Sequence, residues 1–528
     1  MSLLIRRLGR LALLLGLAAW ALPAASAGLT AEEEIGKKIY FEGISPSGVP
    51  IQALVGATST PVSGETLTCS TCHGADGLGR PEGSVKPSNI TWQELTKSYG
   101  HRHENGREHG PFDERSFADV LTYGKDPAGN RLDSTMPRYI MSNKDVAALT
   151  AYIKRMAADL DPGLTADALR IGTLVPASGR MAEVGKAALG VMKGYADTLN
   201  AQGGIFGRRI ELVAADLPED PAAASAAAER LAKEGGVFAL VSPFSVGSEK
   251  SMAELAESAK LPVIGPFTLS PDTTLAVNRY TFYLLPGLNE QGRALADFAA
   301  KELKLTNPIA AVVHPETAGD KEAAAAVEEQ LQTRNWSRIV RASYPPGKLQ
   351  AAKLVADLQQ RGVQVIFFLG GDADLGEFGK QVRDAIWTPY LLAPGARAGR
   401  AAVDLPTTFG NRVFLAYPTL PRDITPKAAG TLSELEKKGG FGARHQPAQV
   451  SALAAMLVLE EALKRAGRDL SRAKLVNALE NLFSFETGVM PGISYGPTRR
   501  IGALGAHIVA VDLSARQFRP TGHYMRLD

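Results

Sequence analysis

Cys69 and Cys72 are the only two cysteines in the 528-residue chain, and His73 follows the second one directly. The spacing Cys-x-x-Cys-His is typical of covalent haem attachment, because two thiols can form thioethers to the porphyrin while the adjacent imidazole ligates the iron. A thiol redox pair does not require the histidine, and a zinc site requires two further ligands at suitable spacing. The motif therefore predicts one covalently bound c-type haem, and it leaves no cysteine for a structural disulfide.

The chain begins with the pattern of an export signal. Arg6 and Arg7 precede an apolar stretch at residues 11–22, and the Ala-Ser-Ala sequence at 25–27 is typical of a cleavage site. The apolar stretch is short for a membrane span, which needs about 20 residues. We therefore expect a cleaved signal peptide at residues 1–27 and a mature protein in the periplasm.

The composition is that of an ordinary globular protein, with 45% hydrophobic and 21% charged residues. A formal net charge of +3 is too small for a nucleic-acid-binding protein, which needs a dense basic face. The mature chain, at about 500 residues, is too long for a single core. A turn-rich sequence at 159–163 divides it. We predict a first domain at residues 28–158, a linker at 159–168 and a second domain at 169–528.

The two parts differ in their predicted elements. The first has few strand signals and three helical patterns, at residues 31–42, 114–123 and 143–156. The second alternates short apolar runs with amphipathic stretches, which is typical of parallel sheets covered by helices on both faces. Its predicted strands lie at 169–175, 210–214, 237–241, 262–264, 308–313 and 363–369, and its predicted helices at 182–200, 221–233, 248–260, 320–333, 348–360 and 448–465.

The first domain resembles class I cytochrome c over most of residues 28–158. The resemblance rests on the sequence C-S-T-C-H-G at 69–74, a glycine-rich loop after it, and a later Met136-Pro137 pair. It implies an all-α domain in which His73 is the proximal ligand of the iron and Met136 the distal one. A methionine ligand raises the reduction potential, and two filled axial positions favour outer-sphere transfer of one electron.

The resemblance also implies a proline carbonyl that accepts a hydrogen bond from the proximal imidazole. Pro87 is the better spaced candidate for this role and Pro81 the poorer one. Other residues compete with Met136 for the distal position. Met141 lies five residues further on, and three histidines crowd one segment with the sequence H-R-H-E-N-G-R-E-H at 101–109. We predict that this segment is a solvated loop of mixed charge, with bis-histidine ligation or a surface metal site as the alternatives.

The second domain resembles type I periplasmic solute-binding proteins of the branched-chain amino acid group over residues 169–520. The most specific match is N-A-Q-G-G-I-F-G-R-R-I at 200–210, which follows the family pattern N-x-x-G-G-I-x-G-R-x-I, and T-G-V-M-P-G-I at 487–493 also fits. The resemblance implies two α/β lobes that are joined by a hinge and close on a ligand in the manner of a Venus flytrap.

The positions that hold an amino acid in this family carry different residues here. Val246 stands where the family has the serine that binds the α-carboxylate, and Leu269 stands at its threonine. Gly395 replaces the acid that pairs with the α-ammonium, and Ala318 replaces a tyrosine. A shift of the alignment by one residue restores two hydroxyls but not the acid. An unpaired zwitterion in a closed cleft is costly, so we expect a less polar ligand than a free amino acid.

The expected pocket has an apolar wall and a few polar contacts. The candidate apolar residues are Phe244, Val246, Phe267 and Leu269, and the candidate polar residues are Ser245, Thr268, His314 and Asp372.

These features favour a periplasmic electron carrier fused to a domain that binds a small organic ligand or a partner. The haem type indicates a periplasmic dehydrogenase as electron donor and a terminal oxidase chain as acceptor. The first alternative is the substrate-binding component of an ABC transporter, delivering ligand to a membrane permease, with an accessory haem domain. The second alternative is a redox-linked sensor or an enzyme subunit. The chain has no recognisable catalytic set, so we do not expect an enzyme.

Overall fold

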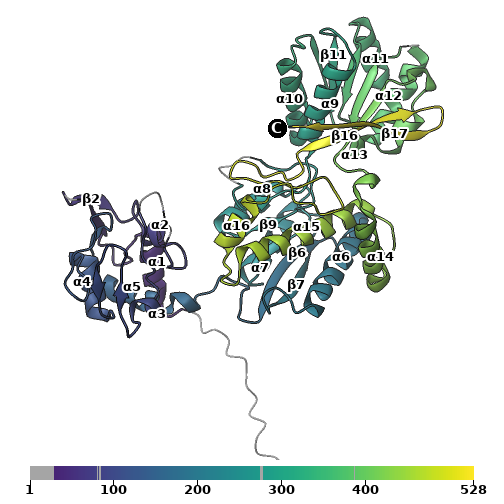
Figure 1. The fold of residues 1–528 in the computed structure, drawn as a ribbon. Helices are drawn as coiled ribbons and strands as arrows, with labels where there is room; N and C mark the ends of the chain where they lie inside the picture. The colour runs from purple at the N-terminus through teal and green to yellow at the C-terminus, as the bar shows by residue number, and fades with distance from the viewer. Residues whose placement is uncertain are drawn as a thin grey trace, which may run out of the picture. The chain divides into compact units, whose positions relative to one another are not determined.

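The computed structural model describes residues 29–527 with the exception of 57, 80, 82–84, 274–277 and 386. The predicted signal peptide lies outside the described residues. The chain divides into two compact units, with the boundary in the sequence between Leu160 and Asp161 (Figure 1). In the described part of the chain, no helix is both long and apolar enough to cross a membrane.

The N-terminal unit contains short helices and short strands. Its helices are α1 (Ala31–Glu42), α2 (Cys69–His73), α3 (Trp92–Leu95), α4 (Glu114–Tyr123), α5 (Asn143–Arg155) and the 3-10 turn η1 (Met156–Ala158). Its strands are β1 (Gln52–Val55), β2 (Thr60–Ser63), β3 (His101–Arg102), β4 (Glu108–His109) and β5 (Arg138–Ile140).

The expectation of an all-α first domain is corrected by these strands. β1 pairs with β2 and with β5 to form a three-stranded antiparallel sheet, and β3 pairs with β4 in a separate hairpin. The strands have two to four residues, and β2 is mostly exposed. Such strands lack the alternating apolar pattern that makes a half-buried strand visible in a sequence.

Helices α1 and α5 form the frame of this unit and pack against each other. Thr30 and Ser142 begin them with reciprocal capping boxes, in which the side chain at the third helical position returns a hydrogen bond to the cap. The helices approach closely at Gly36, where a Cβ atom would come within 2.0 Å of the Ala148 carbonyl oxygen. Tyr40, Leu149 and neighbouring apolar side chains then form a core beneath the haem-binding motif.

The C-terminal unit has two lobes, each with its own sheet. Lobe 1 comprises residues 161–285 and 424–502, and lobe 2 comprises residues 286–423 and 503–527. The elements of lobe 1 are β6 (Ala168–Val175), η2 (Gly179–Met181), α6 (Ala182–Ala201), β7 (Arg209–Asp216), α7 (Pro221–Lys233), β8 (Ala239–Val241), α8 (Glu249–Ser258), β9 (Val263–Ile264), β10 (Thr281–Phe282), α14 (Pro426–Gly439), α15 (Gln446–Ala466) and α16 (Arg472–Glu480). Its five strands are parallel, in the order β10-β9-β8-β6-β7.

Lobe 2 has a seven-stranded sheet in the order β12-β11-β13-β14-β15-β16-β17, whose last two pairings are antiparallel. Its elements are α9 (Leu288–Glu302), β11 (Ala310–Pro315), α10 (Ala318–Thr333), β12 (Ile339–Tyr344), α11 (Ala351–Gln360), β13 (Val365–Phe368), α12 (Asp372–Ala385), β14 (Tyr390–Pro394), α13 (Gly395–Ala398), η4 (Gly399–Asp404), η5 (Thr407–Phe409), β15 (Val413–Tyr417), η6 (Pro421–Asp423), β16 (Gly505–Asp512) and β17 (Gln517–Arg526).

Helices cover both faces of each sheet, as the alternating sequence predicts. In lobe 1, α6, α14, α15 and α16 contribute to one core, and α7 and α8 contribute to the other. In lobe 2, α9 and α10 cover one face, and α11 and α12 cover the opposite face. The chain passes between the lobes three times, near residues 285, 423 and 503. The first and third passages lie side by side, because Tyr283 pairs with Ile501.

Candidate haem site and ligand-binding positions

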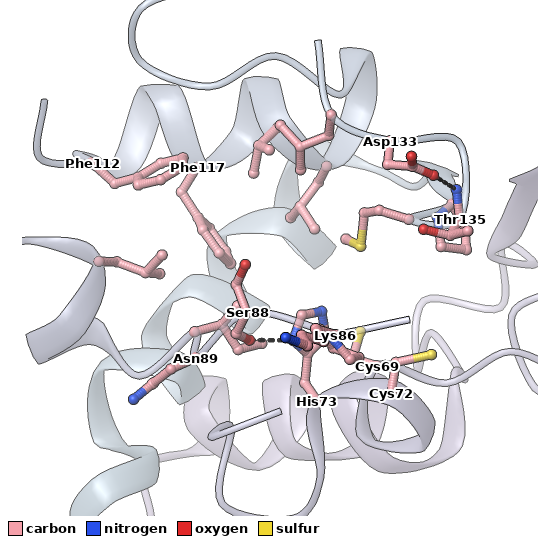
Figure 2. A pocket seen from close by; sticks show the side chains of 18 of the residues that line it. Cys69, Cys72, His73, Lys86, Ser88, Asn89, Phe112, Phe117, Asp133 and Thr135 are labelled. Carbon is pink, nitrogen blue, oxygen red and sulfur yellow. Dashed lines mark hydrogen bonds between the residues drawn. The ribbon is translucent and has the colours of Figure 1, made fainter. Parts of the chain in front are cut away.

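A cavity of about 650 Å³ in the N-terminal unit brings the predicted haem residues together. Cys69, Cys72, His73 and Met136 all line it, although Met136 comes from a different part of the chain. Figure 2 shows the two cysteines and His73 grouped on one side, with Asp133 and Thr135 on another wall. The volume lies within the range of about 300–1,000 Å³ that is usual for ligand pockets.

Helix α2 sets the spacing of the two thiols. Cys69 and Cys72 are three residues apart on this short helix, so their side chains share one face. Both thiols are free. Cys69 as a whole is only half-buried, but its thiol is packed deeply enough that burial raises its pKa to about 12. A buried, protonated thiol is a weak nucleophile, which is consistent with haem attachment before the domain has folded.

The imidazole of His73 is buried and oriented by one hydrogen bond. Its Nδ1 lies 2.9 Å from the carbonyl oxygen of Ser88, so Nδ1–H donates and Nε2 keeps its lone pair (Figure 2). Burial lowers the pKa of His73, against the opposing effect of the Ser88 hydrogen bond. A neutral imidazole with a fixed tautomer is the form that ligates iron.

The assignment of Pro87 as the hydrogen-bond acceptor is therefore wrong. Pro87 lines the cavity, but the acceptor is the carbonyl of the next residue, Ser88. The Pro87 carbonyl instead packs over Gly79, where a Cβ atom would lie 2.1 Å from its oxygen. The spacing of a proline alone cannot distinguish which of two consecutive carbonyls points at the ring.

Met136 ends a short turn on the opposite segment of the cavity. Its N–H donates to the Asp133 carbonyl at 3.2 Å, and Asp133 also accepts from the N–H of Thr135 (Figure 2). Arg138 steadies this turn, because its guanidinium donates to the carbonyls of Leu132 and Met136. Met141 belongs to the surrounding core and is not among the described residues that line the cavity.

The segment 101–109 has the exposed residues of mixed charge that the prediction describes, at Arg102, Glu104 and Glu108, but it is a hairpin and not an irregular loop. It forms the β3–β4 hairpin, and His101, His103 and His109 pack together and line the haem cavity. His109 is buried. The cross-strand pairing of His101 with His109 brings their rings to the same side of the hairpin. No group of three or more metal-binding side chains among the described residues is arranged to hold a metal ion, so the alternative of a separate metal site here is not supported.

In lobe 1, the candidate ligand residues follow the carboxyl ends of β8 and β9, where ligands bind in open α/β sheets. Val246 and Leu269 are exposed, at 59% and 40%. Phe267 is half-buried and packs against buried Phe244, with the two rings tilted and their centroids 4.7 Å apart. The structure thus groups the predicted apolar residues.

The predicted hydroxyls of lobe 1 are less available than those apolar side chains. Ser245 is buried, and its hydroxyl has no hydrogen-bond partner among the described residues. Thr268 donates to the Glu249 carboxylate at 2.6 Å and accepts from the N–H of Ser270. A one-residue shift in the alignment would place Ser245 and Thr268 at the two anchor positions. The hydroxyl of Ser245 is buried, and that of Thr268 is already hydrogen-bonded to Glu249.

In lobe 2, the ring of Tyr417 occupies the space beside Gly395. The parallel register pairs Pro394 with Ala416, which places Gly395 next to Tyr417. A Cβ atom on Gly395 would come within 2.2–2.5 Å of three ring atoms. An acidic side chain cannot be accommodated at this position unless the ring moves.

The two other polar candidates in lobe 2 already have local partners. His314 is buried, and its Nδ1 lies 2.7 Å from the Pro315 carbonyl oxygen. Asp372 is exposed at the start of α12 and accepts from the N–H of Ala373 at 2.8 Å. Sequence reasoning missed Tyr417, because only the strand register brings it to Gly395. It also missed Ser88, since a backbone carbonyl leaves no trace in residue type.

Comparison with known proteins supports the same division of the chain. Residues 168–512 match the family model described as periplasmic binding protein, and residues 63–157 match the one described as cytochrome c. Two curated relatives are a Leu/Ile/Val-binding protein homolog 3 of Brucella melitensis biotype 1 and an amino acid binding protein of Pseudomonas aeruginosa. The first is 24% identical over 61% of this chain and 85% of the relative. The second is 26% identical over 53% of this chain and 75% of the relative.

Solved structures show the same two-lobed fold. An ABC transporter substrate-binding protein from Desulfitobacterium hafniense has a TM-score of 0.54 at 20% identity, covering 68% of this chain and all of the other. A fatty acid ABC transporter substrate-binding protein from Thermomonospora curvata has a TM-score of 0.52 at 18% identity, covering 69% of this chain and 92% of the other.

The fold and the site define a c-type cytochrome domain joined to a two-lobed solute-binding domain. The chain belongs to the periplasmic binding protein family, and its cytochrome c domain implies one covalently bound haem c. Membership of this family places it among exported periplasmic proteins.

Proposed function

We propose that the protein is a periplasmic one-electron carrier whose second domain binds a small organic ligand less polar than a free amino acid. The observation that supports the electron-transfer role best is the cavity lined jointly by Cys69, Cys72, His73 and Met136. The cysteines would hold haem c through thioethers, with His73 and Met136 as axial ligands. When bound, the haem supplies an iron that alternates between ferric and ferrous states.

The protein's own residues provide orientation and exclusion of water. Ser88 accepts from Nδ1 of His73 and so leaves Nε2 free, the atom that would ligate the iron, and Arg138 holds the turn that carries Met136. Phe112, Phe117 and other apolar side chains line much of the remaining wall (Figure 2). Two axial ligands on the iron would leave outer-sphere electron transfer as its role. A periplasmic dehydrogenase as donor and a terminal oxidase chain as acceptor are the partners that we propose.

The ligand of the second domain is inferred from the residues at the family's anchor positions. Val246 and Leu269 offer apolar surface in place of hydroxyls, and Tyr417 fills the space of the ammonium-binding acid beside Gly395. Leaving a polar group without a partner costs about 2–7 kcal/mol, depending on the reference state. An amino acid would therefore lose its two strongest anchors, whereas an apolar or aromatic compound would not.

Delivery of a solute to an ABC permease is the second candidate function. It is favoured by the relatives that are named as Leu/Ile/Val-binding and amino acid binding proteins. In that case the haem domain would be an accessory, and the cleft would bind a branched-chain amino acid. A third candidate, a redox-linked sensor, would require ligand binding to change the reduction of the haem.

The electron-transfer proposal is tested on the two thiols. Cys69→Ala combined with Cys72→Ala should abolish haem that survives denaturing electrophoresis, because both thioethers are lost. Each single variant should retain one thioether and stain for haem. Haem that remains attached in the double variant contradicts the proposal. Reversible one-electron reduction of the wild-type protein, measured with and without candidate ligands, then distinguishes the carrier from the sensor.

A further inference from the structure

The β3–β4 hairpin gathers three histidines at the wall of the haem cavity. His101, His103 and His109 all line it, with ring centroids 4.8–6.1 Å apart. Arg107 of the hairpin and Lys86 are the other cationic side chains among the described lining residues. The proposed ligation of the iron uses none of these groups, so their clustering at the cavity calls for a different role.

The hydrogen bonds of the hairpin define where the protons lie. His109 Nδ1 is 2.7 Å from the Gly110 carbonyl oxygen, so His109 carries its proton on Nδ1 and presents a lone pair at Nε2. His103 Nε2 is 3.0 Å from that Nε2, so His103 must donate. In the neutral pair, Nδ1 of His103 is therefore the basic atom.

We propose that the His103–His109 pair takes up one proton when the haem iron is reduced. The electron that reduces the haem would come from an external one-electron donor, and Nδ1 of His103 would take up the matching proton from solvent to form an N–H bond. The resulting imidazolium donates a charge-assisted hydrogen bond from Nε2 to neutral His109, which is stronger than the bond between two neutral rings. This inference rests on the proposed haem site, because the pair lines the same cavity.

Charged groups around the hairpin set the proton affinity of His103. Burial, followed by the neighbouring Arg107, lowers the pKa of His103 to about 4, and Asp126 opposes them. Arg107 is itself paired with the buried Asp126 carboxylate at 2.8 Å, so part of its charge is neutralised. The other titratable groups at the hairpin are His101 with Glu94 and Lys97 beside it, the ion pair of Lys86 with Glu104, and the exposed ion pair of Arg102 with Glu108.

Reduction makes the cavity more negative by one charge, which raises the pKa of a nearby base. A unit charge about 10 Å away, at an effective dielectric constant near 20, shifts a pKa by about one unit. Coupling should therefore appear in the acid range, because burial and Arg107 hold the pKa of His103 below its usual value, and in a window about one pH unit wide between the ferric and ferrous pKa values.

The test is the midpoint potential of the full-length haem protein, titrated from acid to neutral pH. The wild-type potential should fall with rising pH inside the window and be flat on either side. His103→Gln keeps a side-chain N–H donor but does not titrate, so its potential should be flat throughout. His101→Gln is the matched control, because His101 also lines the cavity but lies outside the hydrogen-bonded pair; its potential should still fall with rising pH, in a window moved to somewhat higher pH because His101 helps to lower the pKa of His103.

A wild-type potential that does not change with pH overturns the inference. A pH-dependent potential that persists in His103→Gln also overturns it. A second readout does not depend on the variant folding. With ¹⁵N-histidine labelling, NMR can follow the eight imidazoles of the chain in both oxidation states. Nδ1 of His103 should protonate at higher pH in the ferrous protein, and equal pKa values in the two states contradict the proposal. Absence of covalent haem from the wild-type protein contradicts the proposed function itself, so the two failures are distinguishable.

Discussion

The aromatic ring of Tyr417 lies over Gly395 so closely that a Cβ atom there would come within 2.2 Å of Tyr417 Cζ. The register of two adjacent parallel strands fixes this approach, since Pro394 pairs with Ala416. The glycine is therefore required by its neighbour. A side chain at position 395, including the acid that the family resemblance predicts there, would have to displace the Tyr417 ring.

Gly395→Ala should lower the free energy of unfolding by about 1–3 kcal/mol, the usual cost of overpacking. Urea unfolding followed by circular dichroism measures this change. Gly371→Ala is the matched control, because a Cβ atom on Gly371 meets no heavy atom within 4 Å. Equal stability of the two variants would show that the Tyr417 ring yields easily, and that the space beside Gly395 can hold a side chain.

Leucine, isoleucine and valine should not bind measurably at millimolar concentration. Val246 and Leu269 cannot hydrogen-bond an α-carboxylate, and Gly395 cannot pair with an ammonium. A ligand present at about 100 times its Kd would stabilise the folded state by about 2.7 kcal/mol. Isothermal titration calorimetry on the full chain makes this measurement, with an aromatic or aliphatic carboxylic acid without an amine as the comparison. A micromolar Kd for leucine would mean that the shifted alignment is correct, and transport would become the leading function.

Met136→Ala should remove the iron–sulfur charge-transfer band of the ferric protein and lower the reduction potential, because the thioether is lost. Met141→Ala is the control and should leave both unchanged, since Met141 does not line the cavity among the described residues. Absorption spectroscopy and a redox titration give the two readouts. The opposite pattern would assign Met141 as the ligand, and insensitivity to both changes would point to the histidines of the β3–β4 hairpin.

Asp297 should make lobe 2 sensitive to acid. Its buried carboxylate accepts from Arg334 at 2.8 and 2.9 Å and from Gln330, and these bonds lower its pKa although burial opposes them. Because the pKa of Asp297 is lower in the folded state than in the unfolded state, the ionised carboxylate stabilises the fold at pH values above the unfolded-state pKa of about 3.9. This stabilisation is lost as the pH falls through the folded-state pKa. Asp297→Asn should therefore cost about 1.5–3 kcal/mol at neutral pH, the range for charged hydrogen bonds, and less in acid.

Urea unfolding at neutral and acidic pH measures the contribution of Asp297. Asp384→Asn is the matched control, because Asp384 forms an exposed pair with Arg383 at 3.4 Å and such pairs are worth little. Its effect should stay within about 0.5 kcal/mol at both pH values. A cost for Asp297→Asn that does not change with pH would show that the carboxylate acts through packing and not through its charge.

The sequence predicts best where local signals and burial agree. Helix α7 spans Pro221–Lys233, as predicted, because Asp220 caps it and proline suits its first turn. The α/β alternation of the second domain and its family pattern likewise rest on long, periodic segments. In the first domain, β1 and β5 are too short to show a period, so their pairing could not be anticipated.

The candidate site divides in the same way. The Cys69–His73 motif is contiguous, and its chemistry could be read directly from residue types and spacing. The role of Ser88 depends on a backbone carbonyl, and that of Tyr417 depends on strand register, which residue types do not encode. The clustering of the three histidines on the hairpin could have been suspected from the pairing of positions 101 and 109 across a turn, but their proximity to the haem cavity required the tertiary fold.

The order in which the chain is made has a consequence for its assembly. Among the described residues, the core of the N-terminal unit is formed by side chains from Leu29 to Met156. The larger core of lobe 1 combines residues from Leu164 to Leu284 with residues from Ala428 to Tyr495. A chain that enters the periplasm from its N-terminus therefore presents every residue of the cytochrome core first, whereas lobe 1 must wait until α14, α15 and α16 have been delivered. Chains truncated before residue 428 should mature as haem proteins while leaving lobe 1 unfinished and open to proteolysis.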